Sequence, residues 1–77
     1  MFDASVTYNI EIPKGKYKLE VIKNMLEKNE EEGLIDAYQI LEKNEKTIRI
    51  LILATMRYKR PSFSYSNFME LLEIRAK

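Results

Sequence analysis

The chain has 77 residues, with 13 Lys and Arg against 12 Asp and Glu, a formal net charge of +1 and a hydrophobic content of 45%. We expect one globular domain spanning residues 1–77. Cysteine and histidine are both absent, which excludes disulfides, thiolate or imidazole metal ligands, and Ser-His or Cys-His catalytic pairs. Because the net charge is close to zero, binding to a polyanion requires basic side chains that gather on one part of the surface.

No apolar run approaches the roughly 18 residues that a membrane-spanning helix needs. The first residues also lack the basic region followed by an apolar segment that marks a secretory signal. We therefore expect neither a membrane protein nor a secreted one.

The first half of the chain predicts a strand followed by a helix. Apolar and polar residues alternate over residues 2–12, as in a strand with one face in water, and Pro13 ends the pattern. Residues 16–32 have apolar side chains at helical spacing, which predicts an amphipathic helix. Gly33 follows it and suits the left-handed conformation that often terminates a helix.

Two further strands are predicted in the middle of the chain. Residues 34–42 fit either helical or strand spacing, but their length and context favour a strand, which a polar turn joins to a strand over residues 46–58. The 46–58 strand carries Leu51 and Leu53 on one side and isoleucines on the other. A strand that is apolar on both sides indicates a central strand with a packed layer over each face.

The sequence thus predicts an α+β fold: a split β-α-β-β unit with a three-stranded sheet, the 46–58 strand in the middle, plus a C-terminal helix. Residues 59–62 are predicted to be a loop. The last helix is expected over residues 66–76, capped by Ser66 or Asn67 and closing over the leucine face of the central strand.

Two groups of basic residues are candidate RNA-binding sites. Lys14, Lys16 and Lys18 surround the predicted turn into the first helix, where helix amides favour a phosphate. A solvated lysine cluster that keeps the domain soluble explains the same residues.

The second group interleaves cations with aromatic rings. Arg57, Lys59 and Arg60 are followed by Phe63, Tyr65 and Phe68, a mixture that binds phosphates and stacks bases. Alternatively, Tyr58, Phe63 and Phe68 are core residues that hold the last helix in place.

The carboxylates Glu30, Glu31, Glu32 and Asp36 are expected to form a solvated helix end, because no apolar residues enclose them to separate their pKa values. Two glycines do not make a glycine-rich phosphate loop. We expect no enzyme activity, no cofactor, no metal and no small-molecule substrate.

Several segments resemble the N-terminal domain of small-subunit ribosomal protein eight. The closest likeness is Glu-Glu-Gly-Leu-Ile-Asp-Ala-Tyr-Gln-Ile at residues 31–40. Upstream, Ile-Glu-Ile-Pro at residues 10–13 followed by Lys16 and Lys18 resembles the strand and helix start of that family, and Ile-Arg-Ile-Leu-Ile at residues 48–52 resembles a later strand. The basic first helix of the family and its C-terminal domain with a serine-rich RNA-binding loop have no counterpart.

The resemblance implies a structural protein of the small ribosomal subunit that binds ribosomal RNA and neighbouring ribosomal proteins, with Lys16 and Lys18 facing the RNA. The departures from the family pattern suggest a reduced member, as found in mitochondrial or other organellar ribosomes. The alternative is a small protein-protein interaction module or inhibitor, of phage or mobile-element type, which dimerises through Leu51 and Leu53.

Overall fold

The computed structural model describes residues 6–77, so the part of the first predicted strand over residues 2–5 lies outside the described residues. The elements follow one another as β1 (Val6–Pro13), α1 (Leu19–Glu31), β2 (Ile35–Glu42), β3 (Thr47–Ala54), β4 (Met56–Arg57), β5 (Arg60–Pro61), α2 (Tyr65–Leu71) and a π-helical turn η1 (Leu72–Ala76). Alternating apolar side chains form β1, and Gly33, with φ of 75°, follows α1 as predicted.

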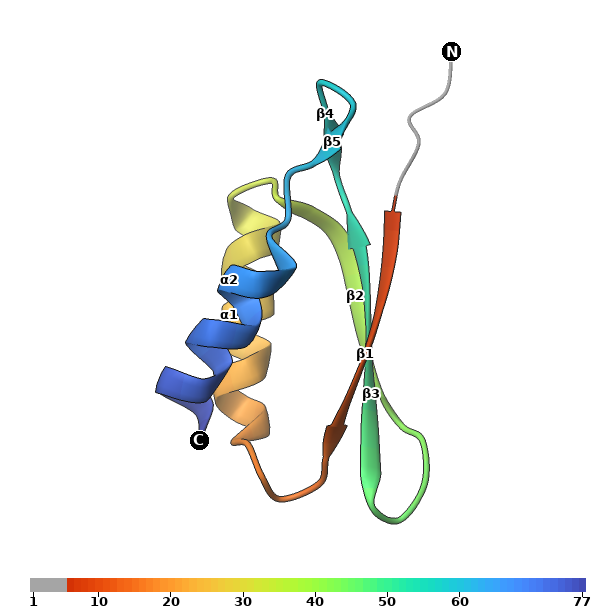
Figure 1. Cartoon of the computed structure of the whole chain (residues 1–77), viewed down its shortest axis with the longest axis vertical. Helices are drawn as coiled ribbons and strands as arrows, with labels where there is room; N and C mark the ends of the chain where they lie inside the picture. The colour runs from red at the N-terminus through yellow and green to blue at the C-terminus, as the bar shows by residue number, and fades with distance from the viewer. Residues whose placement is uncertain (1–5) are drawn as a thin grey trace.

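The predicted α+β fold is confirmed. The main sheet has the order β1-β3-β2, and β3 runs antiparallel to both neighbours, with Val6 opposite Ala54 in one pair and Tyr38 opposite Ile52 in the other. The predicted central position of the third strand is therefore correct. Both helices lie together on one side of this sheet, so the body of the protein has two layers (Figure 1).

The core lies between these two layers. The isoleucines of β3 that point toward the helices are buried and meet Ile22 and Leu26 of α1 and Leu72 of η1. Aromatic rings close one end of this core, where Phe63 lies 5.2 Å from Tyr8 and 5.4 Å from Phe68, centroid to centroid. Such pairs stabilise a core beyond the area that they bury.

The prediction that both faces of β3 are covered is wrong. Along β3 fully buried residues alternate with half-buried ones, and Leu51 and Leu53 are on the half-buried side. The C-terminal helix does not close over them, because Phe68, Leu72 and Ala76 make an apolar stripe that packs on the helix side of the sheet. Leu71, on another side of the same helix, is 42% exposed.

The C-terminal helix begins and ends differently from the prediction. Its cap is Ser64, whose side chain accepts from the Asn67 N–H, rather than Ser66 or Asn67 itself. Its buried residues recur every four positions, which exceeds the 3.6 residues of an α-helical turn, and the wider turn of η1 keeps that stripe facing the core. The N–H of Lys18 donates to the Ala76 carbonyl at 2.6 Å, which joins this end to the start of α1.

The predicted 46–58 strand is too long, because its last residues form the separate strand β4. Part of the predicted 59–62 loop forms the strand β5. β3 ends at Ala54, and the chain then forms a separate hairpin in which β4 pairs with β5. The hairpin projects beyond the sheet at one end of the molecule (Figure 1).

Candidate nucleic-acid interface

A two-residue loop, the commonest connection in β-hairpins, joins β4 to β5. Met56 pairs with Pro61 and Arg57 with Arg60, which leaves Tyr58 and Lys59 as a two-residue loop. Both loop residues have positive φ, 52° and 68°. Positive φ at both central residues is the geometry of a type I′ turn, whose twist matches that of paired strands.

The sequence of this turn is unusual for its shape. Type I′ turns favour Asn-Gly or Gly-Gly, because other side chains are strained at positive φ. Each non-glycine residue held there costs about 1–3 kcal/mol. Tyr58 and Lys59 occupy both positions here, so the tip of the hairpin reduces the stability of the fold.

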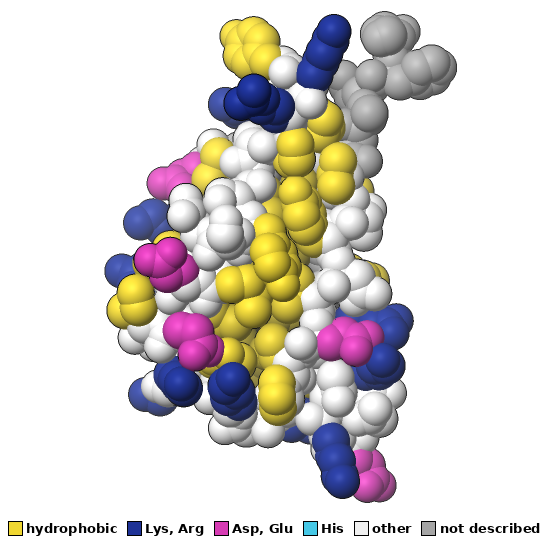
Figure 2. Space-filling model, in the orientation of Figure 1, with side chains coloured by type: hydrophobic (Ala, Val, Ile, Leu, Met, Phe, Trp, Pro, Cys, Tyr) yellow, Lys and Arg dark blue, Asp and Glu magenta, His cyan; other side chains and the backbone are white. Residues whose placement is uncertain are grey.

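The tip also gathers positive charge. From Lys46 to Met69 the sequence has cations at Lys46, Arg49, Arg57, Lys59 and Arg60 and no carboxylate. Three of these cations are exposed on the hairpin beside the Tyr58 ring, which is itself 98% exposed. Figure 2 shows Lys and Arg side chains gathered at the hairpin end of the molecule, whereas basic and acidic side chains are interspersed at the opposite end.

Hydrogen bonds fix the base of the hairpin to the body. The Ser62 hydroxyl lies 2.7 Å from the Thr55 carbonyl and 3.1 Å from the Leu34 carbonyl, and the Ser62 N–H donates to the Thr55 carbonyl at 2.8 Å. The Thr55 hydroxyl donates to Asp36 at 2.8 Å. The projecting tip is therefore held in a defined direction relative to the sheet.

The other predicted RNA site, Lys14, Lys16 and Lys18, lies around the β1–α1 connection. Each of these lysines has a different environment. Lys14 Nζ pairs with Glu42 at 3.0 Å. Lys16 Nζ lies 4.0 Å from Glu73 and 5.2 Å from the centre of the Tyr17 ring, and hydrogen bonding to Tyr17 is the main cause that raises the pKa of Lys16. Lys18 is exposed at the start of α1. Carboxylates therefore offset part of the positive charge of this cluster.

The structure does not bring the two basic groups together. The hairpin with Arg57, Lys59 and Arg60 lies at one end of the longest axis of the molecule, which measures 41 Å, and the β1–α1 connection lies at the other (Figure 1). A single ligand must be long or bent to contact both.

Leu51 and Leu53, the predicted protein interface, lie on the sheet face that the helices leave open. Their neighbours across the strands are Thr7 and Ala37 beside Leu53, and Asn9 and Gln39 beside Leu51. None of these four neighbours carries an aromatic ring on which a base can stack. This face is a small apolar strip with a polar border.

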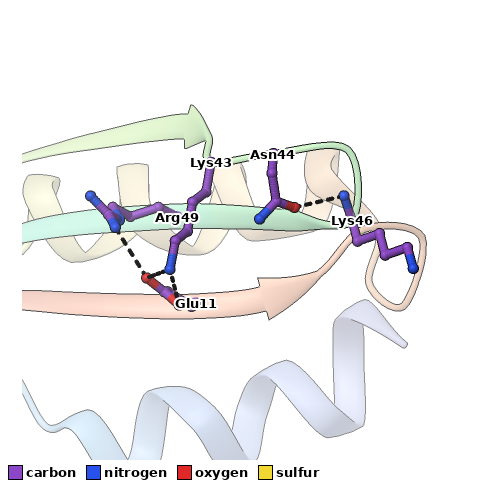
Figure 3. Close-up of polar contacts among 5 residues, drawn as sticks. All are labelled: Glu11, Lys43, Asn44, Lys46 and Arg49. Carbon is purple, nitrogen blue, oxygen red and sulfur yellow. Dashed lines mark hydrogen bonds and ion pairs between the residues drawn. The ribbon is translucent and has the colours of Figure 1, made fainter.

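An ion cluster closes one end of this strip. Glu11 of β1 accepts from Lys43 Nζ at 2.8 Å and from Arg49 Nη2 at 3.2 Å, so the cluster bridges the strands (Figure 3). The hydrogen bond from Lys43, followed by that from Arg49, holds the pKa of Glu11 below its usual value. Leu41 of β2 pairs with Arg49 and is 37% exposed, so apolar surface on this face also lies beside the charged groups.

One residue of the hairpin site differs from the expectation, and two further residues were not predicted. The hypothesis that Tyr58 belongs to the core is wrong, whereas Phe63 and Phe68 are buried as expected. Sequence reasoning missed Thr55 and Ser62, because short hydroxyl side chains carry no signal of the backbone carbonyls that they approach. The two-residue loop was also missed, because Tyr-Lys is not a turn signal.

The carboxylates of the α1–β2 connection are exposed, and Asp36 accepts from Thr55. Within residues 6–77 no His, Cys, Asp and Glu side chains gather in a group of three or more suited to a metal ion. No helix of this part of the chain has the length and apolar character to cross a membrane.

Comparison of the chain with models of protein families, with curated proteins and with solved structures found no match.

Proposed function

We propose that the chain is a structural constituent of the small ribosomal subunit that binds ribosomal RNA through the β4–β5 hairpin and contacts neighbouring ribosomal proteins. The observation that carries this proposal is the cluster of Arg57, Lys59 and Arg60, which projects from the body beside an exposed ring and lies in a stretch without carboxylates. Local segregation of charge provides what a net charge of +1 does not.

The chemistry of the hairpin suits a phosphate backbone. Guanidinium groups bind phosphate oxygens through paired, charge-assisted hydrogen bonds, and each phosphate that is neutralised releases counterions. Only one guanidinium contact to the body is formed on this hairpin in residues 6–77, from Arg57 Nη2 to the Gly33 carbonyl at 3.4 Å. The remaining donors face solvent and are available to an anion.

The resemblance to small-subunit ribosomal protein eight supports the ribosomal assignment. Its three segments correspond to the end of β1, the α1–β2 connection with most of β2, and residues 48–52 of β3. Lys14, Lys16 and Lys18 provide a second RNA contact, and the open face around Leu51 and Leu53 provides a contact for a neighbouring protein. The expected location is a ribosome, mitochondrial or otherwise organellar.

Sedimentation of a lysate tests this proposal. In a low-salt gradient, the chain, followed by mass spectrometry, is expected to migrate with the small ribosomal subunit. High salt should release it, because phosphate contacts weaken steeply as counterions are added. Migration as a small free species at low salt would contradict the ribosomal assignment.

The second candidate function is a small protein-protein interaction module or inhibitor that dimerises. It rests on the sheet face that the helices leave open, where Leu51 and Leu53 are half-buried and a second copy of the chain would cover them. In the same gradient such a protein migrates as a small dimer at both low and high salt.

A further inference from the structure

We infer that Tyr58 is the base-stacking element of the hairpin, so that the site binds an unpaired nucleotide of RNA between the Tyr58 ring and the cations beside it. This inference rests on the proposed function and specifies which form of RNA the site recognises.

The first support is the position of the ring. At 98% exposure, Tyr58 is the most exposed large hydrophobic side chain within residues 6–77, ahead of Ile74 at 71%. The other rings of this region serve the fold, since Phe63 and Phe68 are buried and Tyr65 stacks with Tyr8 at 6.2 Å. Tyr58 therefore presents both ring faces to solvent and stabilises no part of the core.

The second support is the backbone of the turn. A glycine or asparagine at position 58 would adopt the observed φ of 52° with less strain than a tyrosine. The tyrosine raises the free energy of the folded protein, and no packing within residues 6–77 offsets that cost. Strained residues of this kind cluster at functional sites. Here the strained residue carries an aromatic ring at the tip of a hairpin.

The third support is a like-charge pair. Arg57 and Arg60 are direct partners across the β4–β5 ladder. Like charges directly opposite each other destabilise a strand pair. Lys59 adds a third positive charge within the same turn. An anion bound beside the turn would relieve this repulsion, and a phosphate adjoining the stacked base supplies that charge.

The ring and the cations together favour unpaired over paired RNA. In a duplex, neighbouring base pairs cover the faces of each base, so a protruding ring meets only sugar and phosphate. In loops, bulges and single strands the base faces are free to stack on an aromatic side chain. The cations contact phosphates in either form, so only the ring distinguishes the two.

The test measures binding of the full chain to two labelled RNAs by fluorescence anisotropy, an oligouridylate and a duplex of the same length. The informative variant is Tyr58→Asn, which removes the ring but suits positive φ, and the matched control is Tyr58→Phe, which keeps the ring. On oligouridylate Tyr58→Asn is expected to lose about tenfold or more in affinity. Its affinity for the duplex should stay within about twofold of the wild type, and Tyr58→Phe should bind both RNAs like the wild type.

Thermal unfolding of the same variants separates binding from folding. Tyr58→Asn is expected to unfold at the wild-type temperature or above, since asparagine relieves the strain of the turn. Equal binding of Tyr58→Asn and the wild type to oligouridylate, or an equal loss on both RNAs, would overturn the inference and leave the proposed function standing. If the wild type binds neither RNA, or binds polyglutamate as tightly as oligouridylate, the proposed function fails as well.

Discussion

At the scale of single residues, Glu73 connects the C-terminal end to the start of α1. Its carboxylate accepts one hydrogen bond from the Tyr17 hydroxyl and another from Lys77 Nζ at 3.2 Å, and Lys16 Nζ lies 4.0 Å away. The hydrogen bond from Tyr17, followed by that from Lys77, holds the pKa of Glu73 below its usual value. The folded state therefore favours the ionised carboxylate.

This lowered pKa predicts a loss of stability in acid. A carboxyl group with a lower pKa in the folded state stabilises the fold above its unfolded pKa, and this stabilisation disappears as pH falls through the folded pKa. We expect the unfolding temperature to drop between about pH 6 and about pH 3. The drop should be smaller in Glu73→Gln than in the wild type.

Glu70→Gln is the matched control, because Glu70 is an exposed residue of α2 whose side chain forms no hydrogen bond or ion pair with any of residues 6–77. It should retain the full acid sensitivity of the wild type. An identical pH dependence in Glu73→Gln and the wild type would mean that the Tyr17 contact does not form in solution.

At the scale of elements, β3 divides its side chains between two environments. Ile50 is fully buried between the layers, whereas Leu51, the next residue, is half-buried on the open face. The two positions differ in packing although both side chains are large and aliphatic. This difference follows from the helices, which both pack on one side of the sheet.

Alanine substitutions of Ile50 and Leu51 measure how much each side of β3 contributes to the free energy of unfolding. Ile50→Ala is expected to reduce the free energy of unfolding by about 2–5 kcal/mol, because it leaves a cavity in the core. Leu51→Ala should cost less than half as much, since part of its surface already contacts water. The measurement is urea denaturation at low protein concentration. Equal losses would mean that another protein layer, such as a second copy of the chain, covers the open face in solution.

The sequence predicted the sheet and missed the hairpin for physical reasons. Alternation in β1, the helical spacing of α1 and the position of Gly33 are local signals that the structure retains. Apolar residues on both sides of β3 suggested that both faces of the sheet are covered. Which face the C-terminal helix covers depends, however, on the position of the apolar stripe of that helix. That stripe includes Leu72 and Ala76, which lie in the π-helical turn η1, and the sequence carries no local signal of that turn.

The site was only partly predictable. The cations at Arg57, Lys59 and Arg60 were identified from their type and proximity in sequence, and the structure places them on one hairpin. Positive φ at Tyr58 and Lys59 was not predictable, because the pairing of β4 with β5 imposes it against the preferences of both residues.

At the scale of the whole molecule, the two basic groups are separated by most of a long, narrow body, 41 by 24 by 18 Å. The three-stranded sheet runs between them (Figure 1). Sites this far apart and without shared partners act independently in most proteins. The two basic groups therefore do not form one continuous surface.

Independence of the two ends predicts additive effects on RNA binding. Lys18→Gln and Lys59→Gln are each expected to weaken binding, and the double variant should lose the sum of the two free energies within about 0.5 kcal/mol. Affinity for small-subunit ribosomal RNA at fixed salt is the measurement, with Lys23→Gln on the exposed side of α1 as the control. A loss far from the sum would show that both ends engage one rigid RNA element.

The order of pairing has a consequence for synthesis of the chain. β1 is synthesised before its partner β3. Val6 therefore cannot pair until Ala54 has left the ribosome. At typical elongation rates the delay is on the order of seconds. The helix layer is completed later still, when Ala76 reaches Lys18. Until then β1 is an unpaired strand with a row of apolar side chains, which is the kind of segment that aggregates during folding.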